Sequence, residues 1–329
     1  MMGKYIIIGV DVGNYAIKSK NTTLPSGYSV TTREPFMKDD YLLFNERYFS
    51  FGGPVFKYKK DKTVDERAIV FTLGSIAKEI LFIVNKRKCA NGIQYELDQI
   101  EGVDLGVGLP PMHIASLARK TIDYYQKHFK NGIHFEYCGY KFNLKLGKIK
   151  VYPQDYAAAV AYKKEGTGSV KSYKSYVCID IGGYTVDVVT IINGKVDMAK
   201  SDSFELGIIK LYDKIINDVS QNTSLNGILT YDSIEAVLKG EPTILSEEIQ
   251  NIIKEDANEW IKQIVDACAQ KGLDFEIYPV LFIGGGSILL RKCIKNSKCF
   301  VKFEFITNAN ANAVGYEALL KALEKQEEV

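Results

Sequence analysis

The sequence is poor in the residues that build histidine-based catalytic centres. It holds 329 residues but only three histidines, His113, His128 and His134. We expect each of them at the surface or at a helix end. HExxH and GxSxG are absent, so a zinc protease motif or a nucleophile elbow is not supported.

The cysteines are few and scattered. None of the six lies in a CxxC pair, which argues against a zinc ribbon or a redox dithiol. Isolated thiols in a chain of this length predict reduced residues in a cytoplasmic protein. The N-terminal apolar run reaches Asp11 too early for a signal peptide, and we find no apolar stretch near the roughly 20 residues that cross a bilayer. The sequence therefore predicts a soluble cytoplasmic protein that contacts no membrane.

An excess of charge and the common nucleotide motifs are also missing. Lys and Arg total 42 against 40 Asp and Glu, so the formal net charge is +2, and we expect no direct sequence-specific DNA binding. No GxxxxGK[ST] occurs; residues 166–172 lack its second glycine and follow no strand. A GxGxxG turn that opens a helix and the protein-kinase motifs are absent too.

One internal repeat is present. Residues 11–18 read DVGNYAIK and residues 180–187 read DIGGYTVD, about half a chain apart. Each copy follows an apolar run and reads as a buried strand, a glycine turn and a second strand. The matched contexts favour duplication of one fold.

The remaining patterns alternate strands with helices, which predicts an α/β protein. Residues 23–60 read as irregular β structure, and residues 166–169 as a linker between the halves. Apolar spacing predicts helices at 74–86, 112–129, 154–165 and 207–219. Two further helices are predicted, one that Ser246 caps and one that begins at about Ala313. Buried strands are predicted at 103–109 and 279–283.

The two turns have the composition of a phosphate site. A glycine lets backbone N–H groups approach an anion, and consecutive N–H groups form an anion nest. An aspartate at the head of each turn suits a magnesium ion that keeps most of its water. The candidates are Asp11 and Asp180 for the metal and Lys18 for a β-phosphate. The candidates for the phosphate cradle are Gly13, Asn14, Tyr15, Gly182, Gly183 and Tyr184.

Both aspartates are expected to reach the magnesium ion through water molecules. A third glycine cluster, Gly284, Gly285 and Gly286, follows the buried strand at 279–283. Backbone without side chains lets a flat ligand such as a nucleoside press against it. Two matching turns and this cluster together favour a nucleotide site over plain hairpins.

These motifs resemble those of a known superfamily. Asp11–Lys18, Asp180–Asp187 and Gly284–Gly286 match, in order and spacing, the phosphate-1, phosphate-2 and adenosine motifs of the actin-like ATPases. Residues 107–110, 180–187 and 207–212 resemble the plasmid-segregation actins of the ParM/StbA family more closely. The resemblance covers the whole chain.

The resemblance implies a duplicated actin-like (ribonuclease H-like) fold, with two lobes of two subdomains each and a nucleotide cleft between them. The first lobe would span residues 1–166, with a small subdomain at about 23–99. The second would span 167–329, with a small subdomain at about 206–274 and a C-terminal helix at about 313–325 that packs back on the first lobe.

The resemblance also implies an activity. The protein would bind MgATP, with GTP as an alternative, polymerise into dynamic filaments and hydrolyse the nucleotide to drive plasmid DNA segregation. Its partners would be further copies of itself and a DNA-binding adaptor of the ParR type. Asp11 and Asp180 would organise the magnesium, and Gln154 would orient the attacking water. Gly284, Gly285 and Gly286 would contact the adenosine, and Glu205 or Gly207 the ribose.

Several alternatives remain open at this point. Some plasmid members carry Glu where this chain has Gln154, and the neighbouring Asp155 is a second candidate for positioning the water. A small-molecule kinase with Asp155 or Asp187 as base, and a nucleotide-dependent scaffold, are the competing functions. The aromatic residues 41–58 fit either a filament contact or the core of a β-rich subdomain.

Overall fold

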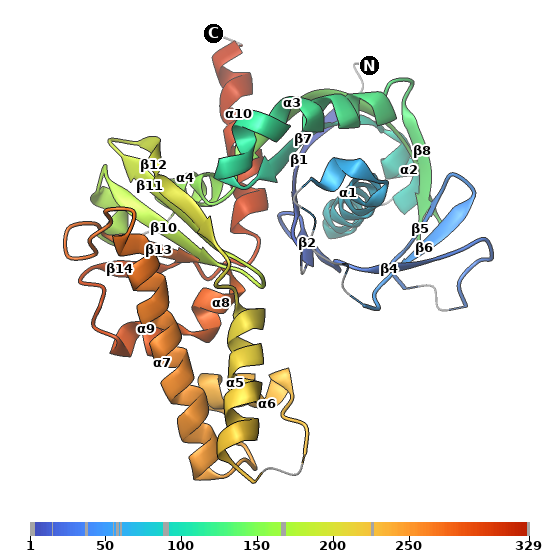
Figure 1. Ribbon diagram of the computed structural model, residues 1–329. Coiled ribbons are helices and arrows are strands. Elements are labelled where there is room, and N and C mark those ends of the chain that lie inside the picture. The colour runs from blue at the N-terminus through green and yellow to red at the C-terminus, as the bar shows by residue number, and fades with distance from the viewer. Residues whose placement is uncertain are drawn as a thin grey trace. The chain divides into compact units, whose positions relative to one another are not determined.

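The computed structural model describes residues 4–14, 16–36, 39–54, 56, 59, 61–87, 92–165, 169–224 and 227–327 (Figure 1). The chain divides into two compact units. Unit 1 comprises Met1–Ala161 and Asn310–Val329, and unit 2 comprises Tyr162–Ala309. Each unit has its own hydrophobic core.

Unit 1 is built on a nine-stranded sheet with the order β3-β2-β1-β7-β9-β8-β5-β6-β4. β1 runs antiparallel to β2 and parallel to β7, and β7 runs parallel to β9. The strands are β1 (Lys4–Val12), β2 (Ala16–Lys18), β3 (Thr23–Pro25), β4 (Tyr28–Thr31), β5 (Tyr41–Phe44), β6 (Arg47–Phe51), β7 (Ile100–Leu109), β8 (Ile133–Tyr137) and β9 (Tyr140–Pro153).

Unit 2 repeats the first part of this topology. Its five-stranded sheet has the order β12-β11-β10-β13-β14. Three antiparallel strands are followed by two parallel ones, as in β3-β2-β1-β7-β9. The duplication predicted from the repeat is therefore confirmed. The strands are β10 (Tyr176–Ile181), β11 (Val186–Ile192), β12 (Lys195–Phe204), β13 (Val280–Ile283) and β14 (Phe303–Phe305).

Helix α1 (Arg67–Lys86) is the central core helix of unit 1, and the strands curve around it (Figure 1). It begins seven residues before the predicted helix at 74–86. Its length and apolar composition match those of a membrane span, which corrects the expectation that no such stretch exists. However, 78% of its most apolar window is buried in the protein, as is typical of a core helix.

Helix α10 (Ala311–Glu327) packs on β1 and β7 and belongs to unit 1. Glycines allow this close approach. A Cβ at Gly9 would lie 2.1 Å from the carbonyl oxygen of Ala313, and one at Gly315 would lie 2.1 Å from that of Ala157. The other helical segments of unit 1 are η1 (Lys62–Val64), α2 (Ile93–Asp98), α3 (Pro111–His128) and α4 (Tyr156–Glu165), the last of which crosses the unit boundary.

Glu317 on α10 gives unit 1 a pH-dependent stability. Burial raises the pKa of Glu317, Lys321 at 3.2 Å and Lys20 at 3.7 Å oppose this shift, and Glu79 adds to it. A raised pKa means that the folded state binds the Glu317 proton more tightly than the unfolded state does. The free energy of unfolding therefore falls as pH rises from the ordinary glutamate pKa of about 4.3 through the raised pKa of the folded state.

We therefore expect Glu317→Gln to raise the thermal midpoint at pH 8 and to leave it unchanged at pH 4, where the native carboxyl is protonated. Thermal unfolding of both proteins across this range is the measurement. A variant that melts lower at pH 8 would show that the two lysines outweigh the cost of burial.

Two helices of unit 2, α5 (Ile208–Asn222) and α7 (Glu247–Ala269), match helices that the apolar spacing predicts. Ser246 caps α7, because its hydroxyl accepts from the N–H of Ile249 at 3.4 Å. Trp260 on the same helix is buried and donates to the carbonyl of Leu206 at 2.9 Å. The helices are η2 (Ser169–Ser172), α5 (Ile208–Asn222), α6 (Tyr231–Lys239), α7 (Glu247–Ala269), α8 (Gly284–Leu289) and α9 (Arg291–Asn296).

The aromatic region 41–58 contributes to the core of unit 1. Tyr41, Leu42 and Phe49 on β5 and β6 are buried, which favours the core interpretation for these strands. The described cysteines are free thiols. Cys89 and the first three residues of the predicted linker at 166–169 lie outside the described residues.

Candidate functional site

The first turn joins β1 to β2 and is held tightly closed. The N–H of Gly13 donates to the carbonyl of Asp11 at 3.0 Å, and a Cβ at Gly13 would lie 2.4 Å from the carbonyl oxygen of Ala16. Asp11 and Lys18 are direct partners in the antiparallel pair, so their side chains share one face. Asn14 lies in this turn, and Tyr15 lies outside the described residues.

Gln154 contacts the aspartate of the first turn. Its backbone N–H donates to the carbonyl of Leu109 at 2.9 Å, which ties it to the end of β7. Its side-chain Nε2 donates to Oδ1 of Asp11 at 2.8 Å. The strands thus bring together two groups that lie far apart in the sequence.

Asp155, the second candidate for positioning water, is placed differently. It is 1% exposed and has a left-handed backbone with φ of 61°. Its backbone N–H donates to Oδ1 of Asn312 at 2.8 Å, which fixes it against the start of α10. Gln154 is therefore the residue of this pair whose side chain joins Asp11.

The second turn, in unit 2, has the same construction. The N–H of Gly182 donates to the carbonyl of Thr185 at 2.9 Å. Asp180 and Asp187 are direct partners in the β10–β11 pair, so Asp187 occupies the place that Lys18 has in the first copy. The Thr185 hydroxyl donates to Asp187 at 3.1 Å.

In both turns the first glycine uses its N–H inside the protein. The sequence predicted that Gly13 and Gly182 donate to phosphate, but these two N–H groups donate to Asp11 and Thr185. The other predicted backbone donors are the N–H groups of Asn14 and Tyr15 after the first glycine and of Gly183 and Tyr184 after the second.

Helix α5 begins directly against the second turn. The N–H groups of Ile208 and Ile209 donate to the carbonyls of Gly182 and Gly183 at 3.0 and 2.9 Å. Gly207 permits this contact, because a Cβ there would lie 2.3 Å from the carbonyl carbon of Tyr184. The positive end of the helix dipole therefore lies at the turn, where it favours an anion.

Glu205 precedes this helix and is exposed. Its side chain is 83% exposed and pairs with Lys210 at 2.7 Å. The hydrogen bond from Lys210 lowers the pKa of Glu205, so it is ionised at neutral pH.

The third glycine cluster meets Asp180. β13 lies parallel to β10 with Ile283 beside Asp180, so the cluster follows at the same sheet edge. Gly284 has φ of 84°, and a Cβ there would lie 1.9 Å from Oδ1 of Asp180. Nothing lies within 4 Å of a Cβ placed at Gly285, so its backbone is open to a flat ligand.

These residues form one group in each unit, and both groups fit a phosphate-bearing ligand. Within the described parts of the chain, no group of three or more His, Cys, Asp or Glu side chains is arranged to hold a metal ion. A metal bound at Asp11 or Asp180 would therefore need phosphate or water oxygens as further ligands, which is how Mg²⁺ is usually held. The groups comprise Asp11, Gly13, Asn14, Lys18 and Gln154 in unit 1, and Asp180, Gly182, Gly183, Tyr184, Gly207, Gly284, Gly285 and Gly286 in unit 2.

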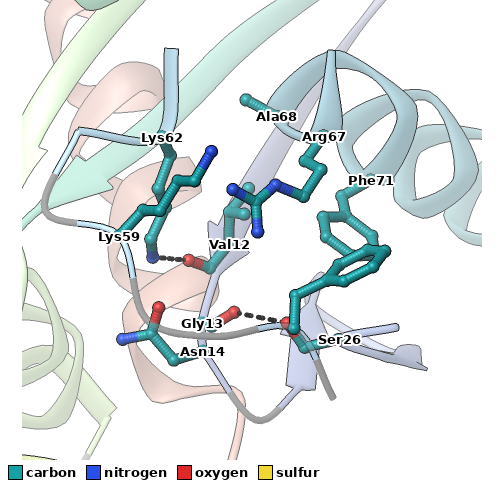
Figure 2. A pocket seen from close by; sticks show the side chains of 10 residues that line it. Val12, Gly13, Asn14, Ser26, Lys59, Lys62, Arg67, Ala68 and Phe71 are labelled. Atoms are coloured by element: carbon teal, nitrogen blue, oxygen red, sulfur yellow. Dashed lines mark hydrogen bonds between the residues drawn. The ribbon is translucent and has the colours of Figure 1, made fainter. Parts of the chain in front are cut away.

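Two residues that the sequence motifs do not include also hold the first turn. Ser26 donates to the carbonyl of Gly13 at 3.1 Å, and Lys62 donates to the carbonyl of Val12 (Figure 2). Neither lies in a motif, since the fold brings them to the turn from β3–β4 and from η1.

A family model matches part of unit 2. Residues 178–296 match the family described as archaeal actin homologue MreB-like, C-terminal. No curated protein matches the chain.

Solved structures match over almost the whole chain. The apo ParM protein of pSK41 has a TM-score of 0.71 at 17% identity, over 98% of this chain and 99% of that one. Ta0583, an archaeal actin homologue in complex with ADP, has a TM-score of 0.66 at 17% identity, over 96% and 99%. A 15-stranded ParM filament from Clostridium botulinum has a TM-score of 0.69 at 17% identity, over 98% and 100%. The chain therefore has the actin-like fold.

Proposed function

We propose that this protein is a ParM-like actin that binds MgATP, polymerises into dynamic filaments and hydrolyses the nucleotide. The observation that carries the proposal is the hydrogen bond from Gln154 to Asp11 at the first of two matching Asp–Gly turns. The ADP complex of the archaeal relative and the filament of the clostridial relative support nucleotide binding and self-association.

The residues take the following roles. Asp11 and Asp180 are the residues that would hold magnesium, and the ion would neutralise charge on the phosphates. Lys18 faces the same side as Asp11 and adds a positive charge at the β-phosphate. The backbone donors of the phosphate cradle are Asn14, Tyr15, Gly183 and Tyr184, since the N–H groups of Gly13 and Gly182 are used inside the turns. Gly284, Gly285 and Gly286 contact the adenosine, and Gly207 and Glu205 remain the ribose candidates.

Gln154 positions the water that attacks the γ-phosphate. An amide is a poor base, but phosphoryl transfer depends mainly on position and electrostatics. Its Nε2 is fixed by Asp11, which leaves Oε1 to accept a hydrogen bond from water. Asp155 is buried against Asn312, so the kinase alternative that uses it as a base gains no support.

The cellular role follows from the same resemblance. We propose a cytoplasmic filament that moves plasmid DNA through a ParR-type adaptor, since a net charge of +2 gives no overall electrostatic attraction to DNA. The subdomains at about 23–99 and 206–274 remain predictions.

The experiment is light scattering with a pelleting assay, followed in parallel with phosphate release. With ATP and magnesium we expect scattering to rise and then to fall as phosphate accumulates. Asp180→Asn, which keeps the size of the side chain, should show neither change. Nucleotide binding without any scattering over a range of protein concentrations would contradict the filament and favour a kinase or a scaffold. A parallel series with GTP tests the choice of nucleotide.

A further inference from the structure

A small basic pocket lies inside unit 1, beside the first turn. Its volume is about 30 Å³, and it lies between Val12–Asn14 and the residues at the start of α1 (Figure 2). A water molecule needs roughly 10–15 Å³ of such space, so the pocket has room for an ion of a few atoms. It is far smaller than the roughly 300–1,000 Å³ of sites that hold drug-sized ligands.

The lining of this pocket is cationic. Lys59, Lys62 and Arg67 line it, and its lining among the described residues includes no carboxylate. Asp65, outside the lining, pairs with both Lys59 at 2.6 Å and Arg67 at 2.7 Å. Burial raises the pKa of Asp65, but hydrogen bonds from Arg67 and Lys59 outweigh it and hold the pKa below its usual range. Asp65 therefore pairs, as a carboxylate, with two of the three cations that line the pocket.

The cations are held in position by their neighbours. The guanidinium of Arg67 lies over the ring of Phe56, 5.2 Å from its centroid. Lys62 donates to the carbonyl of Val12. Figure 2 shows the side chains of Lys62 and Arg67 reaching toward the first turn. Asn14 adds an amide to the lining. Guanidinium, ammonium and amide donors around a small space are the groups that recognise an oxyanion.

We propose that this pocket binds inorganic phosphate, held by Lys59, Lys62 and Arg67. The site goes beyond the proposed function, because none of its three cations is assigned to the nucleotide, although Gly13 and Asn14 of the first turn also line the pocket. Lys62 links the pocket to the backbone between Asp11 and Gly13.

The test is titration of the nucleotide-free protein with inorganic phosphate at constant ionic strength, followed by calorimetry. We expect Lys62→Gln and Arg67→Gln each to weaken binding about tenfold, as for loss of a charge-assisted hydrogen bond. Lys120→Gln is the matched control, because Lys120 pairs with Asp61 and lies outside the pocket lining. It should bind phosphate like the unmodified protein. Circular dichroism checks that each variant is folded.

A second comparison separates this pocket from the proposed nucleotide site. Lys18→Gln should leave phosphate binding intact. If Lys18→Gln abolishes binding and Lys62→Gln does not, phosphate binds at the nucleotide site and the proposal is wrong. Equal weakening by Lys120→Gln, or no binding to the unmodified protein, overturns it as well. Because these measurements use no ATP, a failure of the ATPase proposal does not affect them.

The source of the phosphate needs one further measurement. During ATP hydrolysis, release of phosphate from Lys62→Gln should show a shorter lag than release from the unmodified protein, if product phosphate enters the pocket. An unchanged lag with weakened titration would assign the pocket to phosphate from solution.

Discussion

Gln154→Ala is expected to lower the turnover of ATP by about a hundredfold, which is the scale for losing the alignment of one reacting group. The variant removes the amide that donates to Asp11 at 2.8 Å and would hold the attacking water. Both glycine turns stay intact, so ATP-dependent pelleting should persist and the filaments should last longer. Phosphate release and pelleting, measured on the same samples, test this expectation.

Asp155→Asn is the matched variant. Asparagine keeps the size of the side chain and tolerates a left-handed backbone, and the backbone N–H that contacts Asn312 remains. We expect it to turn over ATP at close to the unmodified rate. Turnover that survives Gln154→Ala but collapses in Asp155→Asn would transfer the water-positioning role to Asp155.

Gly9→Val is expected to lower the free energy of unfolding by about 3 kcal/mol, at the upper end for overpacking a core. The Cβ alone would lie 2.1 Å from the Ala313 carbonyl oxygen and 3.2 Å from the Glu317 nitrogen. These are backbone atoms of α10, so the helix itself has to move away from β1. Urea unfolding is the measurement.

Gly227→Ala is the control for this change. A Cβ at Gly227 meets nothing within 4 Å, so we expect a change within about 0.5 kcal/mol. A Gly9→Val protein as stable as this control would show that α10 is free to shift on β1.

The fold was predictable where one face of an element is polar. Ile249, Ile253 and Trp260 mark one stripe of α7, and Ser246 marks its start, so that helix could be placed correctly. The start of α1 could not be placed, because the residues from Ala68 to Ala77 are all buried and leave no polar face to reveal a period.

The motifs of the candidate site were predictable, but the residues that hold these motifs in place were not. The Asp11–Lys18 pairing follows from a short strand–turn–strand sequence that is local in the chain. Ser26, Lys62 and Asn312 reach their partners only through the tertiary fold, so no local pattern marks them. The internal use of the Gly13 and Gly182 N–H groups depends on the turn geometry, which composition does not specify.

Because α10 belongs to unit 1, the two units are completed at different times during synthesis. Unit 2 is continuous from Tyr162 to Ala309, whereas unit 1 begins before it and resumes after it. A ribosome therefore delivers every residue of unit 2 before it delivers α10. Until then, the face of β1 at Gly9 lacks the helix that covers it in the finished protein. The unit that is started first is thus the last to be completed.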